Sequence, residues 1–142
     1  MLTQKPTVRY IPYEEATGIV REVYDDIMAT KGIATVPNFW RALAVNPEHL
    51  RATWQKLKQT MAAGALDPLT KELIAIAVSV TNGCAYCINS HTASAVKLGM
   101  DTAMFSEVLA VVDVFNGTNR LANGYQVDVD FYPEVPPPAV QS

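Results

Sequence analysis

The sequence predicts an all-α protein, a single domain of about six helices. Apolar residues recur at helical spacing along most of the chain, and Gly, Asn-Pro and Asp-Pro signals divide it into helix-length segments. The chain has 142 residues, the length of one ordinary domain. Its hydrophobic content of 49% is enough for a core, and its charged content of 18% is too low for a disordered chain.

Three helices are predicted in the N-terminal half. The first runs from Glu14 to Lys31, the second from Pro37 through Leu43, and the third follows Asn46-Pro47 and includes Leu50 to Met61; the signals that end them are Gly32, Asn46-Pro47 and Gly64. Their buried faces are predicted from apolar residues three or four positions apart: Val20, Val23, Tyr24, Ile27 and Met28, then Phe39, Trp40 and Leu43, then Leu50, Trp54, Leu57 and Met61. Trp40 and Trp54 are expected in the core or in an interface.

A fourth helix is predicted between Asp67-Pro68 and Asn82-Gly83. Asp67 is a good N-cap residue and Pro68 suits the first helical position. Residues 73–80 also alternate in a way that fits a β-strand. The capped start and the length of the segment favour a buried helix.

Two further helices complete the prediction. One covers residues 84–98 and stops at Gly99. The other starts at Asp101 and runs through Phe115, and we expect Gly117 and Gly124 to bend it or end it early.

The predicted organisation is one domain over residues 1–142. It consists of a helical N-terminal extension (about residues 1–64), a core motif (residues 67–101) and an extended Pro-rich tail (residues 131–142). No internal repeat or domain linker interrupts it.

Charge and hydropathy exclude two classes of partner. The net charge is -3, the pI is about 5.3 and no basic stripe occurs, which is unlike a nucleic-acid-binding protein. We find neither a secretory signal nor an apolar run of about 20 residues, so a cytoplasmic protein without a membrane partner is expected. Thiols stay reduced there, and two cysteines three positions apart then suggest catalysis or metal binding.

The chemistry-bearing residues cluster between residues 72 and 91. On one helix, Cys84, Cys87 and His91 fall within roughly a 60° arc. A Cys-x-x-Cys pair can close a disulfide, the N-terminus of a helix favours a thiolate, and an imidazole one turn after Cys87 can accept its proton. Glu72 stands in an apolar segment and needs a partner, which a proton relay with the cysteine pair would supply.

This pattern, Glu72 followed by Cys84-x-x-Cys87-x-x-x-His91, resembles the alkylhydroperoxidase D branch of the carboxymuconolactone decarboxylase superfamily. The resemblance implies a helical bundle that forms homo-oligomers (trimer, hexamer or dimer) and a thiol-dependent peroxidase that needs no cofactor. It implies that Cys87 attacks a small hydroperoxide and becomes a sulfenic acid, that Cys84 resolves it to the disulfide and meets the reductant, and that His91 and Glu72 relay protons. The implied reductant is a dithiol or a lipoyl-carrying protein.

One residue departs from the family pattern. The best-known members carry His directly before the second cysteine, where this chain has Tyr86. A phenol is a poor base at neutral pH. Tyr86 is therefore counted with the catalytic-site residues as a wall of the site, with simple packing as the alternative. Thiol–disulfide exchange or redox sensing without efficient peroxidase turnover is the main alternative function. A decarboxylase-type lyase is less favoured, because such members typically lack the cysteine pair.

A zinc site is the remaining alternative. Cys84, Cys87 and His91 would supply three ligands, with Glu72 or His49 as the fourth. Three ligands on one short helix are unusual for structural zinc, so the redox interpretation is preferred. His49 follows Pro47-Glu48 at a predicted helix start and is expected at the surface.

Overall fold

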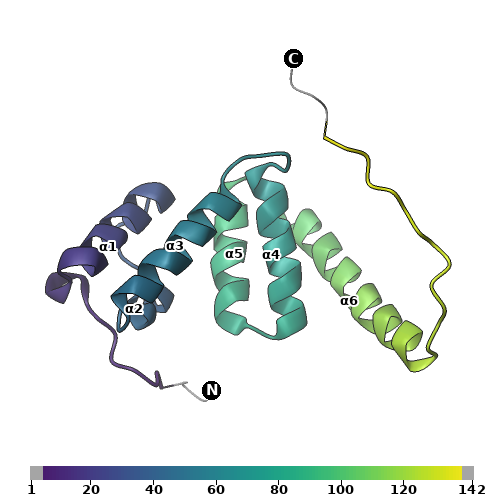
Figure 1. The fold of residues 1–142 in the computed structure, drawn as a ribbon, viewed down its shortest axis with the longest axis horizontal. Helices are drawn as coiled ribbons and strands as arrows, with labels where there is room; N and C mark the ends of the chain where they lie inside the picture. The colour runs from purple at the N-terminus through teal and green to yellow at the C-terminus, as the bar shows by residue number, and fades with distance from the viewer. Residues whose placement is uncertain (1–4, 139–142) are drawn as a thin grey trace. The chain divides into compact units, whose positions relative to one another are not determined.

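The computed structural model describes residues 5–138, and these residues form six α-helices, one 3₁₀ turn and no strand (Figure 1). The all-α prediction with six helices is confirmed. The elements are η1 (Tyr13–Glu15), α1 (Gly18–Lys31), α2 (Asn38–Leu43), α3 (Pro47–Met61), α4 (Pro68–Asn82), α5 (Ala85–Lys97) and α6 (Thr102–Gly124). None of the helices in this range combines the length and apolarity needed to cross a bilayer.

The described residues group into two compact units, residues 5–65 and residues 66–138. The boundary coincides with the predicted junction between the N-terminal extension and the core motif. That the two units act as one domain stays a prediction.

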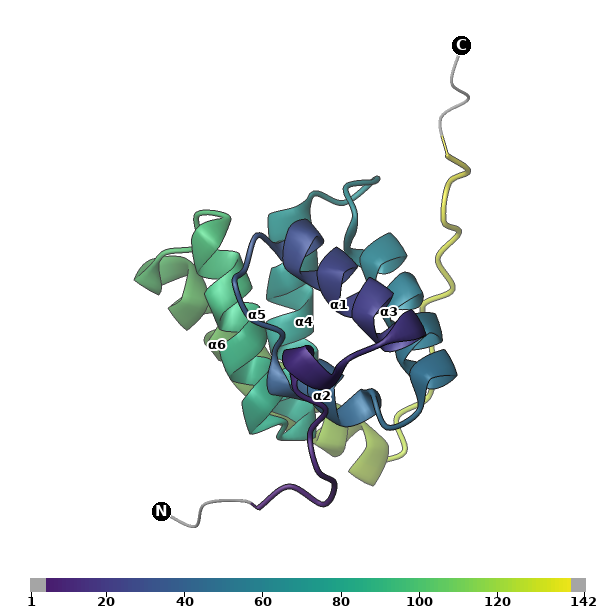
Figure 2. The same cartoon turned by 90° about the vertical axis from the view of Figure 1, so that its left-hand side faces the viewer.

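The first unit packs α1, α2 and α3 around aromatic and aliphatic side chains, with α1 and α3 side by side in Figure 2. Tyr24 and Ile27 of α1 and Leu50 of α3 are fully buried. The rings of Trp40 and Trp54 meet edge to face with centroids 5.2 Å apart, and both residues are buried. Both tryptophans therefore belong to the core.

The first helix begins at Gly18 rather than at residue 14, so the predicted start is wrong. The preceding segment forms η1 and folds back onto α1 instead of continuing it. The Arg21 guanidinium lies 3.7 Å from the centroid of the Tyr13 ring, and the Tyr13 hydroxyl donates to Asp25 at 2.7 Å. These contacts with α1 stabilise the turn against a continuous helix.

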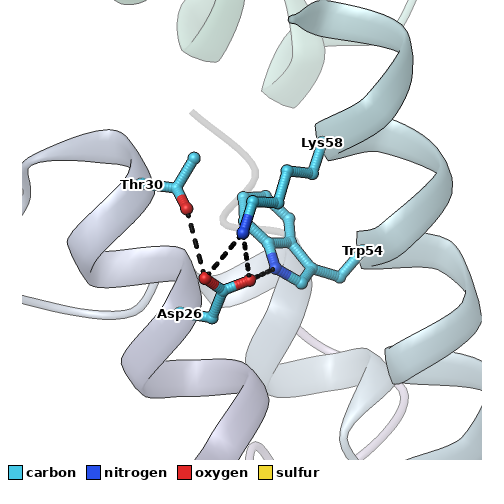
Figure 3. Close-up of polar contacts among 4 residues, drawn as sticks. All are labelled: Asp26, Thr30, Trp54 and Lys58. Carbon is cyan, nitrogen blue, oxygen red and sulfur yellow. Dashed lines mark hydrogen bonds and ion pairs between the residues drawn. The ribbon is translucent and has the colours of Figure 1, made fainter.

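Asp26 joins α1 to α3. Its carboxylate accepts hydrogen bonds from Trp54 Nε1 at 2.6 Å and from Lys58 Nζ at 2.8 and 2.9 Å. It also accepts one from Thr30 Oγ1, on its own helix, at 3.4 Å (Figure 3). Trp54 is only 2% exposed, so its indole N–H needs this acceptor. Asp26 therefore fixes how α3 lies on α1.

The second unit is built on a hairpin of α4 and α5, with α6 against α4. Asp67 caps α4 by accepting from the backbone N–H of Thr70 at 2.9 Å, as predicted. The helix buries Glu72, Ile76 and Ser79, which share one face, and leaves Ile74 and Val78 about half exposed. Residues 73–80 are therefore helical, and their apolar alternation supplies both an inner and an outer face.

The two helices are joined by Gly83 and Cys84. Gly83 adopts the left-handed conformation, with φ of 70°, which costs glycine little. Its N–H donates to Val80 O at 3.1 Å, and the Cys84 N–H donates to Ser79 O at 3.0 Å. Cys84 is consequently the N-cap of α5, and the helix predicted from residue 84 begins at Ala85.

Helix α6 continues without a break through Gly117 to Gly124, so the predicted early end is wrong. The penalty of one glycine is about 1 kcal/mol and is offset by packing on α4. Next to Gly117, the Asn116 side chain donates to Thr81 Oγ1 at 3.1 Å. The predicted tail is extended over residues 131–138, and its remainder lies outside the described residues.

We expect Asp26→Ala to lower the free energy of unfolding at neutral pH by about 1–3 kcal/mol, because the buried Trp54 N–H loses its acceptor. The half-exposed ion pair with Lys58 adds at most about 1 kcal/mol. Chemical denaturation measures the change, with Glu22→Ala, an exposed carboxylate on the same helix, as the control. A wild-type free energy in Asp26→Ala would contradict the assigned role.

The same variant has a defined pH dependence. The hydrogen bonds from Lys58 and then Trp54 lower the pKa of Asp26. A lowered folded-state pKa contributes stability that is present above the unfolded pKa of about 3.9 and is lost as pH falls through the folded value. The difference between wild type and Asp26→Ala should therefore shrink below about pH 4.

Gly83→Ala and Gly117→Ala form a matched pair, because an added Cβ meets no atom within 4 Å at either position. Gly83→Ala should destabilise the protein by about 1 kcal/mol, since Gly83, unlike Gly117, has a positive φ. Gly117→Ala should stabilise it by about 0.5–1 kcal/mol. Urea titration of both variants is the measurement, and equal effects would refute the role of the left-handed turn.

Candidate active site

The two cysteines are joined as a disulfide at the start of α5. The Cys84–Cys87 pair has a Cα–Cα distance of 5.3 Å, and both residues are partly buried. The Cys84 sulfur also accepts a hydrogen bond from the backbone N–H of Cys87 at 3.2 Å. One sulfur therefore occupies the N-cap position and the other lies within the first turn.

Glu72 and His91 meet across the α4–α5 hairpin. Glu72 Oε2 lies 2.7 Å from His91 Nδ1, and Glu72 is 9% exposed. The structure thus supplies the partner that a buried carboxylate needs, and Glu72 points toward α5. With Glu72 ionised, Nδ1–H donates to it and Nε2 is left as the basic nitrogen of the neutral ring.

Local geometry places these two pairs on one helical hairpin. Glu72 lies on the inner face of α4, the short Gly83-Cys84 connection folds α5 back along α4, and His91 is one helical turn after Cys87. Placed in this way, the disulfide and the Glu72–His91 pair belong to the same hairpin. The arrangement combines a dithiol with a hydrogen-bonded base, the pairing required for a thiol nucleophile.

Tyr86 lies between the cysteines in sequence and is 45% exposed. With Ala85, Asn89 and Ser90 it lines a shallow hollow on the surface of α5. None of the other candidate site residues lines this hollow, and the role of Tyr86 in the site stays a prediction.

His49 is exposed in the first turn of α3, where its backbone N–H donates to Asn46 Oδ1 at 3.1 Å. It therefore belongs to the surface, as expected. Within residues 5–138, no group of three or more His, Cys, Asp or Glu side chains is arranged to hold a metal ion.

Ser79 was not predicted as part of the site. Its carbonyl accepts the Cys84 N–H, and its hydroxyl donates to Ala75 O at 2.6 Å, which keeps the side chain satisfied within the buried face of α4. The signal in the sequence is its spacing, two helical turns after Glu72. Ser79 positions the backbone that presents Cys84.

The sequence matches the carboxymuconolactone decarboxylase family over residues 47–129. A crystal structure of the alkylhydroperoxidase AhpD core from Rhodospirillum rubrum aligns with a TM-score of 0.85 and 45% identity, covering 89% of this chain and 96% of that one. That similarity includes most of both chains, so it extends beyond the cysteine motif.

Curated relatives match over shorter segments. An alkyl hydroperoxide reductase of Mycobacterium tuberculosis, Rv2159c, is 32% identical over 89 residues, which is 62% of this chain and 25% of that protein. AhpD of Coxiella burnetii is 29% identical over 80 residues, which is 56% of this chain and 45% of that protein. YdfG of Bacillus subtilis, an uncharacterised protein, is 40% identical over 55 residues, which is 39% of this chain and 37% of that protein.

The matched segments thus span less than half the length of each of these curated relatives. The family match itself covers more than half of the present chain and includes all four residues of the candidate site. The chain belongs to the carboxymuconolactone decarboxylase family, and its likeness to the AhpD core places it in the alkylhydroperoxidase D-like branch.

Proposed function

We propose that this chain is a thiol-dependent peroxidase that reduces small hydroperoxides with the Cys84–Cys87 pair. The supporting observation is a disulfide that shares one hairpin with a buried, hydrogen-bonded Glu72–His91 pair. The relatives named alkyl hydroperoxide reductase or AhpD agree with this reaction class.

The oxidative half-reaction has two steps. The Cys87 thiolate attacks the terminal oxygen of the hydroperoxide, the O–O bond breaks, and the alkoxide leaves and is protonated to the alcohol. Cys87 is then a sulfenic acid. The Cys84 thiolate attacks Cys87 Sγ, the S–O bond breaks, and hydroxide leaves as water, which completes a two-electron oxidation of the pair.

His91 is the base for Cys87. Its Nδ1 is held by Glu72, so its Nε2 is the nitrogen that takes the thiol proton. The Glu72 carboxylate stabilises the imidazolium that results, as an orienting carboxylate does in other nucleophile–base pairs. The same imidazolium then returns the proton to the departing alkoxide.

Turnover requires an external reductant. A dithiol, carried by a lipoyl group on another protein, reopens the disulfide by thiol–disulfide exchange. The surface hollow lined by the exposed Tyr86 is formed by residues that neighbour the two cysteines in the sequence. It offers a contact for such a carrier. Tyr86 also favours the second candidate, a thiol–disulfide exchange protein, because it supplies no base where the best-known family members have His.

The chain also forms a homo-oligomer (trimer, hexamer or dimer) through the outer faces of α4 and α6. Monomeric proteins seldom expose large contiguous apolar surfaces, and such surfaces commonly mark protein interfaces. The exposed apolar side chains on these two helices are Ile74, Val78, Val111, Val114, Phe115 and Leu121.

One equivalent of cumene hydroperoxide should convert both thiols of the reduced protein into one intramolecular disulfide, two hydrogens lighter by intact mass. Cys87→Ser should abolish peroxide consumption. Glu72→Gln should slow it by about 100-fold, the scale of a general-base contribution, while Glu107→Gln, an exposed change on α6, should leave the rate unchanged. Thiol counting and peroxide consumption are the measurements.

The same assay separates the alternatives. Thiols that persist with peroxide but exchange rapidly with a dithiol would replace peroxidase with disulfide exchange. An activity on a lactone acid that survives replacement of both cysteines by serine would identify a lyase.

For the oligomer, we expect Val114→Asp to reduce the mass measured by size-exclusion chromatography with light scattering, because it places a charge on an apolar contact. Ser106→Asp introduces the same group at another exposed position of α6 and should leave the mass unchanged. A wild-type protein that elutes as a monomer would refute the proposed interface.

A further inference from the structure

The two sulfurs of the pair lie in different electrostatic positions. Cys84 precedes α5 with extended backbone (φ -86°, ψ 90°), and its side chain takes the place of an N-cap acceptor. The Cys87 N–H donates to Cys84 Sγ at 3.2 Å. Cys87 itself lies inside the first turn of α5, past the cap position.

An N-cap position favours a charged acceptor. The first N–H groups of a helix have no partner within it, and the helix dipole adds a partial positive charge there. A disulfide sulfur is a weak acceptor, whereas a thiolate carries a full negative charge and forms the stronger, charge-assisted bond. After the disulfide is reduced, a thiolate is therefore stabilised more strongly at Cys84 than at Cys87.

Charge repulsion then increases the difference in ionisation between the two thiols. The Cα atoms are 5.3 Å apart, so a thiolate on Cys84 opposes a second thiolate on Cys87. The other ionisable side chains of this part of the hairpin are His91 and Tyr86 on α5 and Glu72 on α4, and Glu72 is engaged with His91.

We infer that Cys84 is the ionised member of the reduced pair, and that Cys87 keeps its proton until His91 removes it. This inference rests on the proposed use of the pair as a dithiol and adds which sulfur carries the charge between turnovers. The resolving nucleophile is then already a thiolate when Cys87 becomes a sulfenic acid. Cys84 attacks Cys87 Sγ, the S–S bond forms, and the oxygen leaves as hydroxide and takes a proton, so the sulfenic acid is short-lived.

Alkylation of the fully reduced wild-type chain by limiting iodoacetamide tests the inference, because only thiolates react rapidly. At about pH 6, peptide mass spectrometry should find roughly ten times more label on Cys84 than on Cys87. Equal labelling or preferential labelling of Cys87 would overturn the assignment.

A second measurement removes any effect of access to the reagent. The ultraviolet absorbance of the thiolate is titrated in Cys87→Ser, which retains Cys84, and in Cys84→Ser, which retains Cys87 and an N-cap hydroxyl. The Cys84 thiolate should form at the lower pH, and Cys87 should ionise at a lower pH in Cys84→Ser than in the wild type. The reverse order refutes the inference. Neither experiment uses a peroxide, so a chain without peroxidase activity still gives a decisive result.

Discussion

A carboxylate on the inner face of α4 is the constraint on which the candidate site depends. A buried carboxylate is costly without a partner, and the partner of Glu72 is His91 on the neighbouring helix. This contact joins α5 to α4, beside the apolar packing of Ile76 on Ala95, and selects the nitrogen of His91 that faces away from Glu72. The cysteine pair follows, because Cys87 is one turn from His91 and Cys84 is part of the connection between the helices.

In the N-terminal unit, too, a carboxylate on one helix is hydrogen-bonded to side chains of another helix. Asp26 joins two helices through a buried indole and a lysine, as Glu72 joins two helices through an imidazole. The difference lies in the partner. An indole N–H and an ammonium group only donate at neutral pH, whereas an imidazole can also accept a proton, so only the second pair is suited to proton transfer.

Much of this arrangement was predictable from local patterns. Caps and breakers predicted the start of α4 at Asp67-Pro68 and the division at residues 64–67. The spacing of Cys84, Cys87 and His91 predicted one helix for all three, whereas Cys84 is the N-cap before α5 and only Cys87 and His91 lie within the helix. Periodicity alone did not predict the contact between Glu72 and His91, because they are 19 residues apart and periodicity does not report which helices pack. Only the family resemblance implied that these two residues act together. Residues 73–80 were ambiguous because large apolar residues alternate with small ones, as in a strand. In the helix, Ile74 and Val78 lie on the exposed face, whereas Ile76 and Val80 face inward.

The errors have a common physical origin. Residues 13–17 leave the helix because Tyr13 contacts Arg21 and Asp25, and α6 passes Gly117 because it packs on α4. In each case a contact with another element outweighs a local preference of about 1 kcal/mol. The start of α5 was misplaced by one residue for a different, local reason. The left-handed Gly83 ends α4, and Cys84 directly after it is the N-cap of α5 rather than its first helical residue.

The brevity of the loop closed by Cys84 and Cys87 has a consequence for the reaction cycle. Cross-links restrict the unfolded chain in proportion to the logarithm of the loop they close, and these cysteines are separated by only three positions. Opening the bond therefore releases little chain entropy compared with a staple that spans a domain. In the proposed function, the hairpin around the sulfurs therefore stays folded while the pair alternates between its oxidised and reduced forms.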